Sequence, residues 1–374
     1  MKFLLVLVLC TSAVFGLKKD DLGTGFPDEW YEEAADSAED DGLSTIPHFM
    51  DADEDFAGYF GESEASAEAP MNILEVARKN GATIFVKAAI LVGLKDELSN
   101  HNDITAFIPS NRAFARLPKL VYLYFLRHPD RLRALLKYHV VKGSFALADL
   151  VDDEAHDTLL HNLTVRYDEY KHTKDNRTTR VIQGAHVNCK KNDLKASNGY
   201  VHIIDDVILR FSLVDSYEVI SKCPAFSTLY NGLVVAKLSD ALKSGSLTVF
   251  APTEKAFKRL PAGVWEKILQ DPQQLTNVLD LHIVEGTHFA RGFRNDDVLP
   301  TLNKADSVTI TIRHDRRVEN GLSRRHHKGE FEVLVNNAKI VSFDGVTTTG
   351  VIQAIDKVLL PPSILEEYNM VDLD

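Results

Sequence analysis

The feature that most constrains this 374-residue chain is an internal repeat. Leu247–Leu260 reads LTVFAPTEKAFKRL, and Ile104–Leu117, which reads ITAFIPSNRAFARL, is a second copy displaced by 143 residues. Further along, NGYVHIIDDVIL around Gly199 matches TGVIQAIDKVLL around Gly350 at an offset of 151. A repeat this long indicates two tandem globular domains and not a solenoid of short units. The change of offset predicts that the second copy has gained eight residues between His282 and Gly350.

Within each copy, helical patterns come first and strand patterns follow. Apolar residues three and four positions apart predict two helices in residues 72–98, broken at Asn80-Gly81. ITAFIPS predicts a strand that ends at Pro109, with Ser110-Asn111 capping the next helix. PDRLRALLKYHVV predicts a helix running into a strand, LTVRYDEY and TTRVIQGAHVN predict a hairpin, and GYVHIIDDVIL predicts a closing strand.

The second copy repeats this order. It predicts helices at Phe226–Leu242, around Glu254–Leu260 and at Gln273–Leu281, and strands at Leu247–Ala251, Ser307–Arg313, Phe331–Val335, Lys339–Phe343 and Gly350–Leu359. Helices in the first half of a unit and strands in the second are typical of an α+β domain, and not of an alternating α/β fold.

The ends of the chain differ from its middle. Residues 1–16 predict a secretory signal peptide, because one lysine precedes an apolar run too short to span a membrane. Residues 17–70 are predicted to be disordered, since they are acidic and lack a sustained apolar period. We place the first domain at 71–212, the second at 214–362 and an acidic C-terminal tail at 363–374. The sequence therefore predicts a secreted, extracellular protein with no membrane span and no lipid anchor.

The net charge of −12 is concentrated at the N-terminus. Residues 1–70 contain 17 acidic side chains and 3 lysines, so the rest of the chain is nearly neutral. Its behaviour toward partners therefore depends on local patches and not on bulk charge.

Cysteines and glycosylation sequons bear on the same compartment. Once the signal leaves with Cys10, the mature chain has Cys189 and Cys223, and an oxidising compartment favours a disulfide between them. Such a bond would fix the angle between the domains and contribute about 3–4 kcal/mol in the chain-entropy model. Two buried thiols, or thiols paired between molecules, stay open as alternatives. Asn162 and Asn176 begin glycosylation sequons on the predicted hairpin of the first domain.

These motifs together resemble a known family. A strand followed by Pro-Ser/Thr-x-x-Ala-Phe, then Leu-Pro, x-His-x-Val-x-Gly and x-Gly-x-x-x-x-Ile-Asp-x-Val-Leu, is similar to the pattern of fasciclin-like adhesion domains, and it occurs twice. The resemblance implies that each domain is a β-sandwich or wedge with helices packed on one side. It also implies cell–matrix or matrix–matrix adhesion through integrin-type receptors or matrix components such as collagen, without catalysis or a cofactor.

The resemblance also implies candidate receptor-binding residues. The family's Tyr-His motif matches Tyr138-His139, and its Asp-Ile pair matches Asp193-Leu194. The second domain departs from these motifs at Leu281 and Gly345, so the first domain is favoured. A structural role stays open for the histidine, because a residue kept in both copies is also what a buried, hydrogen-bonded core histidine would give.

The residues gained by the second copy fall between Arg313 and Glu330, where six of 18 positions are Arg or Lys. Guanidinium groups pair bidentately with sulfate and carboxylate, so this basic loop is a candidate for binding glycosaminoglycans. The candidate residues are Arg316, Arg317, Arg324, Arg325 and Lys328. A solvated polar loop, a docking site for the acidic tail and a processing site at Arg313–Arg317 stay open as alternatives.

No motif points to catalysis. The sequence lacks Gly-x-Ser-x-Gly, a cysteine nucleophile placed with a base, and His-Glu-x-x-His. His314, His326 and His327 have no Cys or carboxylate at metal-ligand spacing, and no nucleic-acid reader motif is present. We therefore expect no catalytic residues, no metal and no cofactor. Adhesion is the prediction, a glycosaminoglycan-binding module is the first alternative, and a small-ligand carrier or hydrolase is the second.

Overall fold

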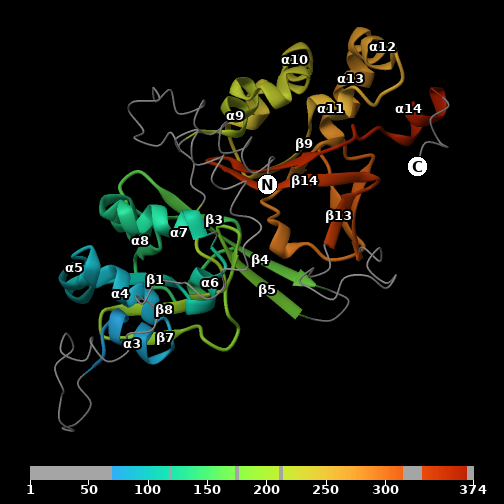
Figure 1. Ribbon diagram of the computed structural model, residues 1–374. Helices are drawn as coiled ribbons and strands as arrows, with labels where there is room; N and C mark the ends of the chain where they lie inside the picture. The colour runs from blue at the N-terminus through green and yellow to red at the C-terminus, as the bar shows by residue number, and fades with distance from the viewer. Residues whose placement is uncertain (1–69, 118, 173–176, 210–213, 315–330, 369–374) are drawn as a thin grey trace, which may run out of the picture.

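The computed structural model describes residues 70–117, 119–172, 177–209, 214–314 and 331–368. The two repeats form two domains, each with its helices on one side of its strands (Figure 1). The first domain contains, in chain order, α3 (Ile73–Lys79), α4 (Thr83–Leu91), α5 (Lys95–Asn100), β1 (Ile104–Pro109), α6 (Asn111–Ala115), α7 (Lys119–Arg127), α8 (Pro129–Tyr138), β2 (Val140–Lys142), η3 (Leu147–Asp149), β3 (Glu154–Asp157), β4 (Thr164–His172), β5 (Arg177–Ile182), β6 (Ala185–His186), β7 (Leu194–Ala196) and β8 (Gly199–Ile204).

The second domain repeats this order. It contains α9 (Ser216–Lys222), η4 (Pro224–Phe226), α10 (Ser227–Val235), η5 (Ser239–Lys243), β9 (Leu247–Pro252), α11 (Glu254–Phe257), α12 (Val264–Gln270), α13 (Pro272–Leu281), β10 (Ile283–Glu285), η6 (Ala290–Gly292), β11 (Asp297–Pro300), β12 (Ser307–His314), β13 (Phe331–Val335), β14 (Ala338–Thr347), β15 (Gly350–Ile355) and α14 (Pro362–Glu367). The order of helices before strands confirms the predicted α+β class.

The helices follow the predicted signals, with additions. The break at Asn80-Gly81 is present, because α3 ends at Lys79 and Gly81 has a left-handed φ of 84°. A second break lies at Gly93, with a φ of 67°, so residues 72–98 form three helices where the apolar period predicts two. The sequence patterns also do not reveal α7, α9 and α12.

Each domain has its strands in two halves. In the first domain they form two four-stranded sheets, ordered β2-β1-β8-β7 and β3-β4-β5-β6. In the second domain the long strand β14 belongs to both halves, so one seven-stranded sheet runs β10-β9-β15-β14-β13-β12-β11. Irregular register between Ile340 and Gly345 marks the place where β14 passes from one half to the other.

Two apolar cores stabilise each domain and produce its layers. One core of the first domain lies between the helices and the β1 sheet and includes Phe85, Leu98 and Ile104. The other lies between the two sheets and includes Phe107 and Tyr167. The second domain has the same pair of cores. This is the predicted sandwich with helices on one side.

Glycine is required where the closing strand begins. Gly199 pairs with Ile104 and has a φ of 149°, and a Cβ added there would overlap the backbone carbonyl of Ile104. Gly350 stands in the same relation to Leu247. The glycines of the repeated motif therefore allow the two parallel central strands to approach each other.

The insertion in the second domain is longer than the offsets indicate. Tyr167 pairs with Ile182 in the first domain, and Ile310 pairs with Val335 in the second. The offset therefore rises from 143 to 153, so the β12–β13 connection has ten extra residues and not eight. Two extra residues of the first domain, between β6 and β7, return the offset to 151 and hide this difference in the sequence.

The C-terminal boundary also needs correction. Pro362–Glu367 form helix α14, and Ile364 is buried in the helical core of the second domain. The second domain therefore continues past residue 362 into the stretch predicted as an acidic tail. The predicted signal peptide and acidic segment lie outside the described residues. Over the described ranges, none of the helices has both the length and the apolar character that crossing a membrane requires.

Candidate functional site between the two domains

The first domain inserts a tyrosine into the second. Tyr170 lies on β4, and its hydroxyl donates to the Thr287 carbonyl at 2.9 Å and accepts from the Phe289 amide at 3.0 Å. Its ring covers Gly292 so closely that a Cβ at that position would overlap it. Val181 of β5 packs in the same apolar cluster as Phe289. The β4–β5 hairpin is therefore an anchor between the domains.

Polar contacts surround this anchor. Arg166 of β4 donates to Asp153 Oδ1 at 3.1 Å and to Ser246 Oγ of the second domain at 2.7 Å. Thr287 Oγ1 donates to the same Asp153 oxygen at 2.7 Å. At the edge, Arg291 forms an ion pair with Asp206 at 2.6 Å. The domains are thus held by directional bonds as well as apolar packing, which favours one relative orientation.

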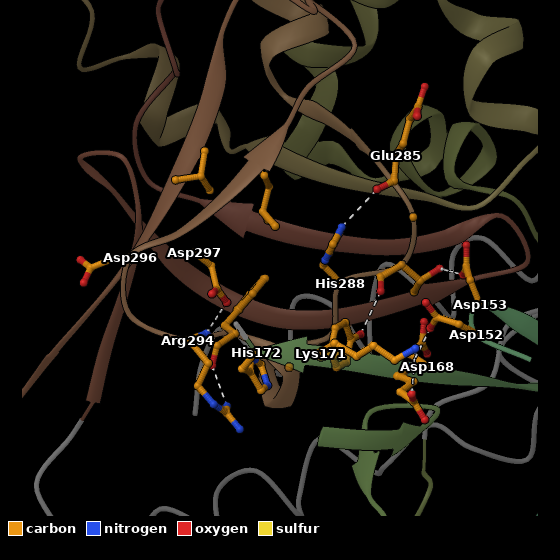
Figure 2. Close-up of a pocket in the computed structure, with 18 of the residues that line it drawn as sticks. Asp152, Asp153, Asp168, Lys171, His172, Glu285, His288, Arg294, Asp296 and Asp297 are labelled. Carbon is orange, nitrogen blue, oxygen red and sulfur yellow. Dashed lines mark hydrogen bonds and ion pairs between the residues drawn. The ribbon is translucent and has the colours of Figure 1, made fainter. Parts of the chain in front are cut away.

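A cleft of about 850 Å³ lies beside the anchor and is lined by both domains. We call it the interdomain cleft. Its acidic lining residues are Asp152, Asp153, Asp168, Glu169, Glu285, Asp296 and Asp297, and its Lys and Arg residues are Lys171 and Arg294. Figure 2 shows Asp152, Asp153 and Asp168 gathered at one end of the cleft, with Asp296 and Asp297 at the other. The cleft is therefore strongly negative, although the domains as a whole are nearly neutral.

Asp168 is the most unusual group in this cleft. Its side chain is 1% exposed, and within the described part of the chain neither carboxylate oxygen has a hydrogen-bond partner. Burial raises the pKa of Asp168 well above its ordinary value, and the neighbouring Asp153 raises it further. Buried polar groups are almost always hydrogen-bonded, so an orphaned carboxylate beside a cleft calls for an explanation.

The second domain supplies an internal comparison for this end of the cleft. Asp152 Oδ1 accepts from the Glu169 amide at 2.7 Å, and Asn295 Oδ1 accepts from the Ile312 amide at 2.8 Å at the equivalent position. Asp168 corresponds to Thr311, at the offset of 143 that relates β4 to β12. The fold thus needs a hydrogen-bond acceptor at the position of Asp152 and Asn295. It does not need a carboxylate at the position of Asp168 and Thr311. The negative charges of Asp152 and Asp168 exceed what the fold requires.

The sequence motifs did not point to this cleft. Asp152, Asp168 and Tyr170 lie in strand or loop segments without a recognisable binding pattern. The available signal was the mismatch between the copies, where one strand position holds Asp168 in the first copy and Thr311 in the second. Only the domain contact shows that these positions share one cleft with residues 285–299.

The predicted receptor residues Tyr138 and His139 are in the core. Both side chains are 1% exposed, and the Tyr138 hydroxyl donates to the Thr164 carbonyl at 3.0 Å. His139 Nδ1 lies 2.7 Å from the Leu135 carbonyl, while Nε2 accepts from the Ile208 amide at 2.9 Å. Burial lowers the pKa of His139 to about 4. The structural alternative explains both residues, since neither side chain is presented to a receptor.

His282 repeats this arrangement in the second domain. Its Nδ1 lies 2.7 Å from the Val278 carbonyl, and Nε2 accepts from the Leu359 amide at 3.0 Å. Burial lowers its pKa to about 4 as well. Each imidazole is therefore neutral and hydrogen-bonds both to a helix end and to the segment after the closing strand.

Asp193 and Leu194 also have structural contacts. Asp193 has a left-handed φ of 51°, its Oδ1 accepts from the Leu147 amide at 2.6 Å, and its amide donates to His202 Nδ1 at 3.1 Å. Leu194 is partly buried against the helical core. The Asp193 side chain is nevertheless 44% exposed, so its free surface remains open to a partner.

Asp344 repeats the Asp193 network with one exchange. Its Oδ1 accepts from the Ala290 amide at 2.8 Å, and its amide donates to Gln353 Oε1 at 2.9 Å. Gln353 takes the place of His202, and each then contacts a carbonyl, that of His288 or Phe145, at 3.0 Å. The aspartate is kept in both domains because it holds a left-handed turn, even where Gly345 interrupts the receptor motif.

The structure does not contain the predicted bond between Cys189 and Cys223. Cys189 is a free, exposed thiol in the turn region after β6. Cys223 ends α9 and is buried in the helical core of the second domain. The domain orientation depends instead on the β4–β5 anchor, which lies away from both cysteines in the sequence.

Of the remaining predicted sites, only Asn162 lies within the described residues. Asn162 is exposed in the turn before β4 with a φ of 61°, so its sequon is accessible. Asn176 and the basic-loop residues Arg316, Arg317, Arg324, Arg325 and Lys328 lie outside the described residues. No group of three or more His, Cys, Asp or Glu side chains within the described ranges is placed to hold a metal ion.

Two known proteins are similar to this chain over about three quarters of its length. Transforming growth factor-beta-induced protein ig-h3 from Sus scrofa is 28% identical over 275 residues, covering 72% of this chain and 36% of that protein. Periostin from Homo sapiens is 26% identical over 288 residues, covering 76% of this chain and 31% of that protein. The chain thus spans about a third of the length of these relatives.

A solved fasciclin domain pair from the insect cell adhesion molecule fasciclin I aligns at 20% identity, with a TM-score of 0.36 over 76% of this chain and 99% of that one. The model of the fasciclin domain itself matches residues 80–210 and 224–361, one match for each domain described above. This chain belongs to the fasciclin domain family and contains two fasciclin domains in tandem.

Proposed function

We propose that this protein is secreted and mediates cell–matrix or matrix–matrix contacts, acting by presenting surfaces and not by catalysis. The observation that supports this most directly is the pair of fasciclin domains, matched over both halves of the chain and related to ig-h3 and periostin. The bonded anchor between the domains adds to it, since partners that contact both domains would meet a preset spacing.

The test is attachment to surfaces coated with the full chain. We expect cells to attach above an albumin-coated control, or immobilised collagen or another matrix component to retain the chain. Loss of cell attachment on chelation of divalent cations is the result expected for an integrin-type receptor. A chain that neither supports attachment nor is retained by any matrix component would refute the proposal.

Asp193 offers a sharper test of receptor contact in the first domain. Asp193→Asn keeps an oxygen to accept from the Leu147 amide but removes the exposed charge, so the turn is expected to survive. Asp344→Asn, at the buried equivalent position, is the matched control. We expect the first variant to lower the number of attached cells and the second to leave it unchanged. Equal attachment by both variants would remove Asp193 from the proposal.

A second candidate function is glycosaminoglycan binding by the basic loop. The observation that favours it is the extension of ten residues at the β12–β13 connection, where the first domain has a shorter hairpin. Arg324→Ala with Arg325→Ala is expected to lower the salt concentration at which the chain elutes from heparin. Lys142→Ala with Lys195→Ala removes the same charge from exposed sites in the first domain and is the control. If both double variants elute from heparin at the same salt concentration, the basic loop is excluded as the glycosaminoglycan-binding site.

A further inference from the structure

We propose that the interdomain cleft binds an organic cation, an alkylammonium or guanidinium group, through Asp168 with Asp152 and Asp153. This inference does not depend on the proposed adhesive function. It rests on the buried, unpartnered carboxylate of Asp168, the excess of negative charge at this end of the cleft and the aromatic rings that line it.

The first step is the state of Asp168 itself. An isolated carboxylate in an apolar setting costs several kcal/mol unless it is paired or protonated. Neither oxygen of Asp168 meets a donor among the described residues. The nearby Arg166 is directed instead to Asp153 and to Ser246 across the interface. A cationic ligand would supply the pairing that the chain itself does not.

The second step is the internal repeat. The second domain keeps the same backbone contacts with Asn295 in place of Asp152 and has Thr311 in place of Asp168. Neutral residues therefore satisfy the fold at both positions. The two carboxylates occur only in the copy whose β4 strand faces the other domain. Their placement fits recognition of a positive group better than a requirement of the fold.

The third step is the chemistry of the cleft walls. The rings of Tyr170 and His288 lie 6.2 Å apart and both line the cleft. Cationic side chains are attracted to aromatic faces as well as to carboxylates. The cleft volume of about 850 Å³ exceeds that of one arginine or lysine side chain. The absence, in the described ranges, of three carboxylate or histidine ligands around one point favours an organic cation over a metal ion.

The cationic residues that line the cleft do not neutralise Asp168. Lys171 lies 3.4 Å from Glu169, and Arg294 donates to Thr179 Oγ1 and to the Phe293 carbonyl. The charged and titratable groups that act on Asp168 are Asp152 and Asp153 before β3, Arg166 and Tyr170 on its own strand, and Asp344 on β14. Because burial and the neighbouring carboxylates raise the pKa of Asp168, while only Arg166 lowers it, pairing with a cation is expected to expel a proton.

The experiment is isothermal titration of the full chain with acetyl-Gly-Arg-Gly-amide, and with the same peptide carrying the neutral isostere citrulline. We expect saturable binding of the arginine peptide and binding of the citrulline peptide weaker by at least about tenfold. Spermidine, run in parallel, distinguishes a free amine from a side chain, and saturable binding of either cation supports the site. Failure of both cations to bind would overturn the proposal.

Two matched variants separate the site from general charge effects. Asp168→Asn removes the buried carboxyl group, and Asp240→Asn removes a carboxylate from an exposed position in the second domain. We expect Asp168→Asn to weaken binding of the arginine peptide by at least about tenfold and Asp240→Asn to leave that binding unchanged. Asp168→Asn keeps the side-chain shape and replaces a buried carboxyl group that has no hydrogen-bond partner among the described residues, so the variant is expected to fold. Equal affinities of the two variants would overturn the role of Asp168.

Release of a proton on binding can also be measured. A carboxylate with a purely structural role would release none. Titrations in phosphate and in Tris at the same pH are expected to differ in apparent enthalpy for the unaltered chain and to agree for Asp168→Asn. Equal enthalpies in the two buffers for the unaltered chain would contradict the pairing. The last measurement is a titration with calcium chloride. Calcium binding that depends on Asp168 would overturn the assignment to an organic cation.

Discussion

Lowering the pH from 7.5 to 5 is expected to destabilise both domains through His139 and His282. Each imidazole is buried with one nitrogen against a carbonyl and the other accepting from an amide, so protonation removes an acceptor. Burial lowers the pKa of each to about 4 in the folded chain, against an ordinary value of 6.5. Between these values the unfolded chain binds more protons, and the free energy of unfolding therefore falls as the pH falls.

The size of the effect follows from the two pKa values. At pH 5 each histidine costs about 2 kcal/mol relative to pH 7.5, so the pair costs about 4 kcal/mol over the two domains. Burial also lowers the pKa values of His156, His202 and His288, which act in the same direction. Many single domains have a total stability of only about 5–15 kcal/mol, so a loss of this size is readily measured.

Urea unfolding of the full chain at the two pH values is the assay. The double variant His139→Gln, His282→Gln keeps a donor and an acceptor at each site but cannot titrate, so it is expected to lose most of the pH dependence. Asp168 opposes the effect, because a carboxyl whose pKa is raised by folding gains stability as the pH falls. In an Asp168→Asn background the fall should therefore be steeper. An unchanged or rising free energy of unfolding between pH 7.5 and 5 would refute the reasoning.

Three further predictions follow from particular positions. Gly292→Ala is expected to displace the ring of Tyr170 and loosen the domain contact, which small-angle scattering would detect as a larger radius of gyration. Gly199→Ala is expected to cost at least about 4 kcal/mol because its Cβ overlaps a backbone carbonyl, whereas Gly263→Ala, with a φ of 80° and open space around it, should cost about 1 kcal/mol; urea unfolding compares them. Cys189 is expected to react with a maleimide in the folded chain, and Cys189→Ser should abolish that labelling.

Much of the fold follows from the sequence because the repeat restricts the possible topologies. The strand at Ile104–Pro109, its Ser110 cap and the closing strand from Gly199 occur where the motifs place them. Helices α7, α9 and α12 are not predicted by these motifs. The ten-residue insertion was hidden because a two-residue difference of opposite sign follows it.

The candidate site could not be found by motif reasoning, for a physical reason. Both copies of the repeat contain residues that hydrogen-bond to the backbone, such as His139 and Asp193. In a sequence these residues resemble functional residues because both copies contain them. The cleft depends on residues in which the copies differ, and it forms only where one hairpin meets the other domain. The cysteines show a related limit, because the sequence predicts a disulfide from the presence of two cysteines, whereas Cys189 is a free thiol in the structure.

The exchange of His202 for Gln353 provides a direct test of this distinction between structural and functional conservation. His202 Nδ1 accepts from the Asp193 amide, so Nε2 carries the proton toward the Phe145 carbonyl, and Gln353 reproduces this with its oxygen and nitrogen. His202→Gln is therefore expected to cost less than about 1 kcal/mol, while His202→Leu, which leaves a buried amide unpaired, should cost about 2–3 kcal/mol. Urea unfolding at pH 7.5 compares the two variants. Equal costs would mean that shape and not hydrogen bonding selects the residue, and the structural account of Asp193 would then lose its basis.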